Sequence, residues 1–152
     1  MATTVGNETT LDDLLTDLIQ LDHDAADAYQ AAIDRIEDQG CRSALSAFKQ
    51  DHLRHIEELG EFLSRRGKTP PTAGDMKAYL AKGKVVMGGL IGDKAILQAM
   101  KTNEDDTNTA YERAVQHRDA MPDLHACLQQ GLGDERRHRD WMIEQIKKID
   151  RP

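Results

Sequence analysis

The sequence predicts an all-α protein, an antiparallel four-helix bundle with one long crossover between the second and third helices. Two observations lead to this prediction. Strong helix formers fill most of the chain, and runs of β-branched residues are nearly absent. Apolar residues also recur three and four positions apart in four long segments, as on one face of a helix. The length suits a single domain, which we place at residues 10–152 after a flexible N-terminal tail, residues 1–9.

The first pair of helices is predicted on either side of Gly40, which is expected to end the first of them. Thr10 indicates the start of this helix, because its side-chain oxygen can accept from a first-turn amide. The second helix is expected from about Arg42 to Arg66, before Gly67. The apolar residues expected on the inner faces are Leu11, Leu14, Leu18, Leu21, Ala25, Ala28, Ala32 and Ile36 in the first helix, and Leu45, Phe48, Leu53, Ile56, Leu59 and Leu63 in the second.

The second pair follows an irregular stretch, residues 69–92. A short helix is expected there at residues 76–82, and the glycines after it indicate a flexible or closely packed crossover. These glycines lack the spacing of a phosphate-binding loop, so we interpret them as structural. The third helix is predicted from about Asp93 through Val115, and Pro122 is expected to open a fourth that continues toward the C-terminus.

Charge and hydropathy exclude several classes of partner. The net charge is −7 and the basic residues are scattered, so we expect no nucleic-acid binding. No apolar stretch approaches the roughly 18 residues that span a bilayer, and residues 1–10 do not resemble a signal peptide, so a cytoplasmic protein without membrane contact is expected. Cys41 and Cys127 are expected at opposite ends of the bundle as free thiols. A leftover apolar face could join two copies in a homodimer.

The two halves of the chain resemble each other, which implies that a helix pair has been used twice. The polar residues that match under a shift of 82 or 83 positions are Tyr29 with Tyr111, Asp22 with Glu104, His55 with His138, and His52 with Glu135. Each half therefore offers one carboxylate on one helix and two polar residues three positions apart on the other.

These polar residues lie among apolar neighbours at helical spacing, which predicts that they face the core. Ionisable groups in a bundle core are costly unless they are paired or bind a metal. Carboxylate and imidazole ligands suit iron, manganese or zinc. The residues of the predicted metal site are Asp22, His52, His55, Glu104, Glu135 and His138.

The pattern resembles the ferritin-like di-iron carboxylate proteins, which carry one Glu on each of two helices and Glu-x-x-His on each of the other two. The stretches LIQLDHDAADAYQAAI, FKQDHLRHIEEL and AILQAMKTNEDDTNTAYERA also look like a bacterial ferritin-like family of unknown function, over residues 11–149. The resemblance implies a ferritin-like fold, two iron ions, and redox activity on iron, oxygen or peroxide. It implies that Asp22, His52 and His55 hold one metal, and that Glu104, Glu135 and His138 hold the other, with Glu135 as the bridge.

Two residues depart from the family pattern. Asp22 is one methylene shorter than Glu, and His52 stands where a bridging Glu is expected. The six residues then supply three carboxylates instead of four, which leaves a charge of +1 with two divalent cations. The neighbouring Asp51, Asp106 and Asp134 could compensate, but their spacing points them around the helix. One metal, an asymmetric pair and an empty site all stay open.

Other interpretations of these residues also stay open. The histidines and acidic residues could form a buried hydrogen-bond network in a non-catalytic stress or interaction protein, or the site could carry or store metal without turnover. Tyr29 and Tyr111 fit core packing, with hydroxyls that can support a carboxylate ligand. Both an enzyme and a non-catalytic protein fit this sequence, and it identifies no catalytic residue.

Overall fold

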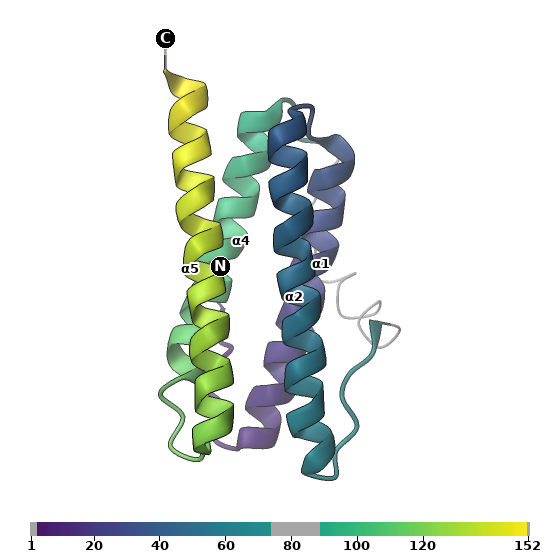
Figure 1. Ribbon diagram of the computed structural model, residues 1–152, viewed down its shortest axis with the longest axis vertical. Helices are drawn as coiled ribbons and strands as arrows, with labels where there is room; N and C mark the ends of the chain where they lie inside the picture. Colours follow the sequence, from purple (N-terminus) through teal and green to yellow (C-terminus); the bar gives the residue numbers. More distant parts are fainter. Residues whose placement is uncertain (1–2, 74–88, 152) are drawn as a thin grey trace.

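The computed structural model describes residues 3–73 and 89–151, and all regular structure in this part of the chain is helical. Four long helices pack as two neighbouring pairs, α1 with α2 and α4 with α5 (Figure 1). This arrangement confirms the predicted all-α four-helix bundle. The short helix predicted at residues 76–82 lies outside the described residues. The bounds of the four helices are Leu11–Arg35 (α1), Gln39–Arg65 (α2), Asp93–Ala114 (α4) and Pro122–Asp150 (α5).

Capping side chains decide where the first two helices begin. Thr10 caps α1 as predicted, because its hydroxyl accepts from a first-turn amide. The prediction that Gly40 ends the first helix is wrong, since α1 ends at Arg35 and Gly40 lies in the first turn of α2. The reason is Asp38, whose carboxylate accepts from the Cys41 amide at 2.8 Å and so starts the second helix before the glycine.

The apolar core is divided into two clusters, one toward each end of the bundle. The first joins the start of α1 and α5 to the end of α2 and α4, and the second joins the opposite ends of the same helices. Cys41 lies in the second cluster and Cys127 packs against the first, and both are free thiols, as predicted. A layer of buried polar residues lies between the two clusters along each helix.

Leu53 is the exception to the predicted inner face of α2. Leu53 is 38% exposed, because His52 takes the inward position and successive residues of a helix point about 100° apart. Among the described residues, no helix combines the length and the apolar character that a membrane crossing requires.

The segment before α1 lies against α4. The amide of Thr3 donates to Asp106 at 3.2 Å, and Arg113 donates to the carbonyl oxygens of Thr3 and Val5. In the same segment, the amide of Gly6 donates to Glu8 at 2.6 Å. Glu8 also forms a side-chain hydrogen bond with Asp17 of α1.

Candidate metal centre

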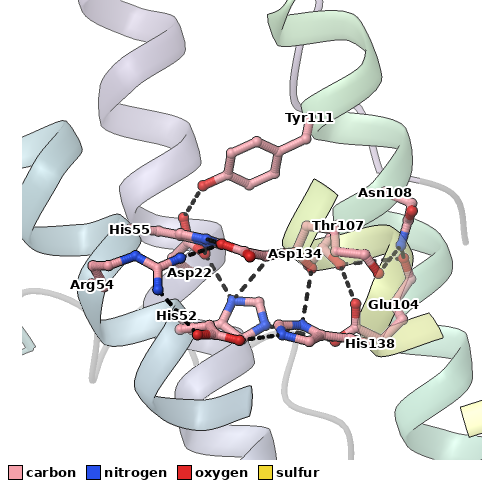
Figure 2. A network of polar contacts seen from close by, with 12 residues as sticks. Asp22, His52, Arg54, His55, Glu104, Thr107, Asn108, Tyr111, Asp134 and His138 are labelled. Carbon is pink, nitrogen blue, oxygen red and sulfur yellow. Dashed lines mark hydrogen bonds and ion pairs between the residues drawn. The ribbon is translucent and has the colours of Figure 1, made fainter. Parts of the chain in front are cut away.

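The six residues predicted as ligands all lie in the polar layer between the two apolar clusters. None of the six is more than 3% exposed. Each helix of the bundle contributes, and the side chains converge on one region of the core (Figure 2). The contributions are Asp22 from α1, His52 and His55 from α2, Glu104 from α4, and Glu135 and His138 from α5.

The six side chains form two overlapping groups of four. In each group, one nitrogen or oxygen atom from every residue lies within 4.8 Å of the others, close enough for a single cation. The groups are Asp22, His52, His55 and Glu135, and His52, Glu104, Glu135 and His138. His52 and Glu135 belong to both groups, so the two positions are adjacent and share two side chains.

The first group gathers around one oxygen of Asp22. This atom, Oδ1, lies 2.8 Å from His52 Nδ1 and 3.2 Å from His55 Nδ1. Glu135 Oε1 lies 3.5 Å from the same two nitrogens. Ligand atoms on a tetrahedral ion with bonds of about 2.0–2.1 Å are about 3.3 Å apart. The separations of 3.2 and 3.5 Å are close to this value, while 2.8 Å is the length of a direct hydrogen bond between Asp22 and His52.

The second group is slightly wider. Glu104 Oε1 lies 3.6 Å from His52 Nε2 and 3.5 Å from His138 Nδ1. Glu135 Oε2 lies 3.9 Å from His138 Nδ1. The two oxygens of Glu135 therefore approach different groups.

Four atoms in this centre are buried without a hydrogen-bond partner among the described residues. They are His52 Nε2, both carboxylate oxygens of Glu135, and His138 Nδ1. Buried polar atoms are normally hydrogen-bonded, and an unpaired one costs about 1–3 kcal/mol. Two nitrogens and two oxygens without a partner, all on residues of the two groups, fit cations bound there.

Two aspartates hold the outer edges of the histidine rings. His55 Nε2 lies 2.9 Å from Asp134, and His138 Nε2 lies 2.7 Å from Asp51. Each aspartate thus comes from the other half of the chain and turns the Nδ1 atom of its histidine toward the centre. As the spacing predicted, Asp51 and Asp134 do not point straight inward. Asp106, the third extra carboxylate, accepts from the amide of Thr3 instead.

Two arginines missed by sequence reasoning link these aspartates. Arg54 pairs with Asp51 at 3.1 Å and also bonds Asp134 (Figure 2). Arg137 pairs with Asp51 at 2.8 Å and Asp134 at 3.1 Å. The four residues connect α2 with α5 through side-chain ion pairs. The repeated pattern Asp-x-x-Arg-His at 51–55 and 134–138 was the signal that could have found them.

Hydroxyl groups hold the carboxylates of Asp22 and Glu104. Tyr111 on α4 donates to Asp22 Oδ2 at 2.6 Å, and Tyr29 on α1 donates to Glu104. Thr107 also donates to Glu104 Oε2 at 3.1 Å. The tyrosines therefore combine the two roles considered from the sequence, packing in the core and supporting a carboxylate. The hydrogen bond from Tyr111 to Asp22 and the one from Tyr29 to Glu104 correspond to each other in the internal repeat.

Mutual pairing sets the charges of the first group. Burial opposes ionisation of Asp22, but His55 and His52 outweigh it and lower the pKa of Asp22 to about 2. Burial likewise disfavours a charged His55, yet Asp22 and Asp134 raise its pKa to about 9. The pKa of His52 also lies well above its usual range, because the surrounding carboxylates outweigh burial.

The remaining carboxylates differ from each other. Burial opposes ionisation of Glu104, but His138 and His52 lower its pKa below the usual range. Burial raises the pKa of Glu135 well above that range, and the neighbouring Glu104 adds to the effect. Without a metal, ionised Asp22 therefore faces protonated His52 and His55, while Glu135 holds a proton.

Fold and site together define a class, the four-helix bundles with a buried carboxylate–histidine centre. The chain belongs to the family described as a domain of unknown function (DUF2383), which matches residues 11–117. This match includes four of the six clustered residues, and Glu135 and His138 lie beyond it. The crystal structure of a conserved hypothetical protein, rv2844, from Mycobacterium tuberculosis has a similar fold. Its TM-score is 0.74 at 18% identity, over 90% of this chain and 98% of that one. No curated protein matches the chain significantly.

Proposed function

We propose that this protein is a ferritin-like metal-binding protein that holds two metal ions in its core, with iron as the first candidate and manganese or zinc as alternatives. The observation that carries the proposal is the set of four buried atoms on His52, Glu135 and His138 that lack a hydrogen-bond partner among the described residues and belong to the two groups of candidate ligands. A mixed set of carboxylates and imidazoles suits these metals.

Each metal position has two ligands of its own, and the two positions share His52 and Glu135. Asp22 and His55 would hold the first metal, and Glu104 and His138 the second, with Glu135 between them. Asp51 and Asp134 orient the histidines, and the tyrosine hydroxyls hold the carboxylates of Asp22 and Glu104. A bound iron pair would supply electrons and activate oxygen or peroxide, which makes an oxidoreductase the first enzymatic function to test.

A second candidate function is a non-catalytic bundle without metal, which acts in stress or in protein interaction. One observation favours it. The cluster balances much of its own charge, since His52 and His55 pair with Asp22 at 2.8 and 3.2 Å. A buried ion-pair network of this kind needs no metal to persist.

The metal content per chain distinguishes these functions. The protein is purified without chelator or metal-affinity tag and compared by elemental analysis with the double variant Glu104→Ala, His138→Ala. A matched control is Asp105→Ala, Arg139→Ala, which removes a pair 3.8 Å apart on the surface of the same two helices. We expect near-stoichiometric iron, manganese or zinc in the native protein and the control, and none in the double variant.

A native protein that is free of metal, and that takes up no added Fe²⁺ under anaerobic conditions, would contradict the proposal and favour the second function. Where metal is bound, assays with oxygen and peroxide separate an oxidoreductase from a protein that stores or carries metal. Consumption of either oxidant that is lost in the double variant would support the enzyme.

A further inference from the structure

His52 lies between the two groups of ligand atoms and presents one ring nitrogen to each. Nδ1 is 2.8 Å from Asp22 and 3.5 Å from Glu135. Nε2, on the other side of the ring, is 3.6 Å from Glu104 and has no hydrogen-bond partner in the part of the chain that the structure describes. The side chain is fully buried, and the rings of Tyr29 and His138 lie with their centroids 5.3 Å from it.

We propose that His52 bridges two divalent cations, with Nδ1 on the cation next to Asp22 and Nε2 on the cation next to Glu104. This inference rests on the proposed metal binding and specifies how the two positions are joined. It gives His52 a role different from those of His55 and His138, which each turn only Nδ1 inward because an aspartate holds Nε2.

The charge of the ligand set supports a histidine bridge. An imidazole bound through both nitrogens has released its last N–H proton to solvent and carries one negative charge. Together with the carboxylates of Asp22, Glu104 and Glu135, the set then carries four negative charges, which balance two divalent cations. A neutral His52 would leave one positive charge uncompensated in a fully buried site, and that is costly.

The positions of the other shared side chain agree with this arrangement. Glu135 approaches His55 Nδ1 with Oε1 at 3.5 Å and His138 Nδ1 with Oε2 at 3.9 Å, so it also offers one atom to each position. Bonds of about 2 Å from both nitrogens of one imidazole ring place two cations about 6 Å apart. Cations in ordinary two-metal sites are about 3.5–4 Å apart.

The first test compares three glutamine variants, His52→Gln, His55→Gln and His138→Gln, by competitive titration of the metal-free protein with Zn²⁺, with circular dichroism to verify the fold. We expect two Zn²⁺ per native chain. His52→Gln should weaken both stepwise affinities by about 100-fold or more, because it removes a ligand from each position. His55→Gln and His138→Gln should each weaken mainly one. A loss at one position only in His52→Gln would overturn the bridge.

The second test measures the separation of the cations by X-ray absorption of the Zn²⁺-loaded protein. The native protein should lack the metal–metal distance of about 3.5–4 Å, and His52→Glu should gain it, because Glu restores a carboxylate bridge. This short distance in the native protein would overturn the inference while leaving the proposed function intact. A native chain that binds no Zn²⁺, Mn²⁺ or Fe²⁺ would contradict the proposed function itself.

Discussion

The hydroxyl of Tyr111 joins the two halves of the repeat, because it donates to Asp22 on a helix 89 residues away in sequence. Tyr29 makes the reciprocal bond to Glu104. Both hydroxyls are buried, and burial beside a carboxylate raises the pKa of each tyrosine well above its usual range. Each tyrosine therefore remains a donor and holds its carboxylate in the ionised, inward orientation.

Removing one of these hydroxyls should destabilise the protein. We expect Tyr111→Phe to lower the free energy of unfolding by about 1.5–3 kcal/mol, because a buried hydrogen bond to a charged group is lost. The measurement is urea unfolding of the metal-free protein. The control is Thr102→Ala, which removes an exposed hydroxyl on the same helix and should change stability by less than about 0.5 kcal/mol. Equal losses in both variants would contradict this role.

Asp17 provides a pH-dependent contribution away from the metal centre. Partial burial, together with the hydrogen bond and repulsion from Glu8, raises its pKa from 3.8 to about 6. The folded state therefore holds this proton more tightly than the unfolded state. The contribution of Asp17 to stability falls as pH rises from about 4 to about 6, and it stays unfavourable above that range.

We expect Asp17→Asn to abolish this pH dependence. Above pH 6 the variant should be more stable than the native protein by about 1 kcal/mol after solvent screening, and below pH 4 the two should coincide. Urea unfolding at several pH values measures the difference. A difference that grows as pH falls would have the opposite sign and would contradict the assignment.

Gly131 allows α5 to approach the ring of Tyr111. A Cβ atom at this glycine would lie 2.6 Å from Tyr111 Cε1, which is closer than carbon atoms approach. On the same helix, Gly133 is exposed, and a Cβ there would meet none of the described residues within 4 Å. The packing of α5 against α4 thus requires a small residue at Gly131 but not at Gly133.

The two glycines make a matched pair of variants. Gly131→Ala should destabilise the protein by about 1–3 kcal/mol, because it overpacks the contact and displaces the tyrosine from Asp22. Gly133→Ala should stabilise it by up to about 1 kcal/mol, because alanine favours the helix. Thermal or urea unfolding compares them, and a stabilising Gly131→Ala would show that the contact is not tight.

Across the whole bundle, a metal bound in the core should stabilise the folded state by mass action. At a metal concentration about 100 times Kd, we expect a gain of about 2.7 kcal/mol in the free energy of unfolding. Excess chelator should reverse the gain, and Glu104→Ala, His138→Ala should eliminate it. An equal gain in that double variant would place the metal elsewhere on the protein.

Much of the fold could be predicted because helix periodicity is a local property. The spacing of apolar residues found all four helices, and their interruption by polar residues at matching positions found the six clustered side chains. Two predictions about the helices were wrong for local reasons other than periodicity, one in helix capping and one in the choice of the inward-facing residue. Asp38 starts α2 before Gly40, and His52 displaces Leu53 from the inner face.

The sequence by itself therefore determined the helices, their inner faces and the residues that meet in the core, since each depends on 3.6 residues per turn. Only the tertiary structure decided which atoms face each other. One ion-pair network joins side chains that point away from the inner faces of α2 and α5, namely Asp51, Asp134, Arg54 and Arg137. These side chains meet because α2 and α5 lie side by side. The placement of the two His52 nitrogens in different groups also depends on distances between helices, which helical periodicity does not contain.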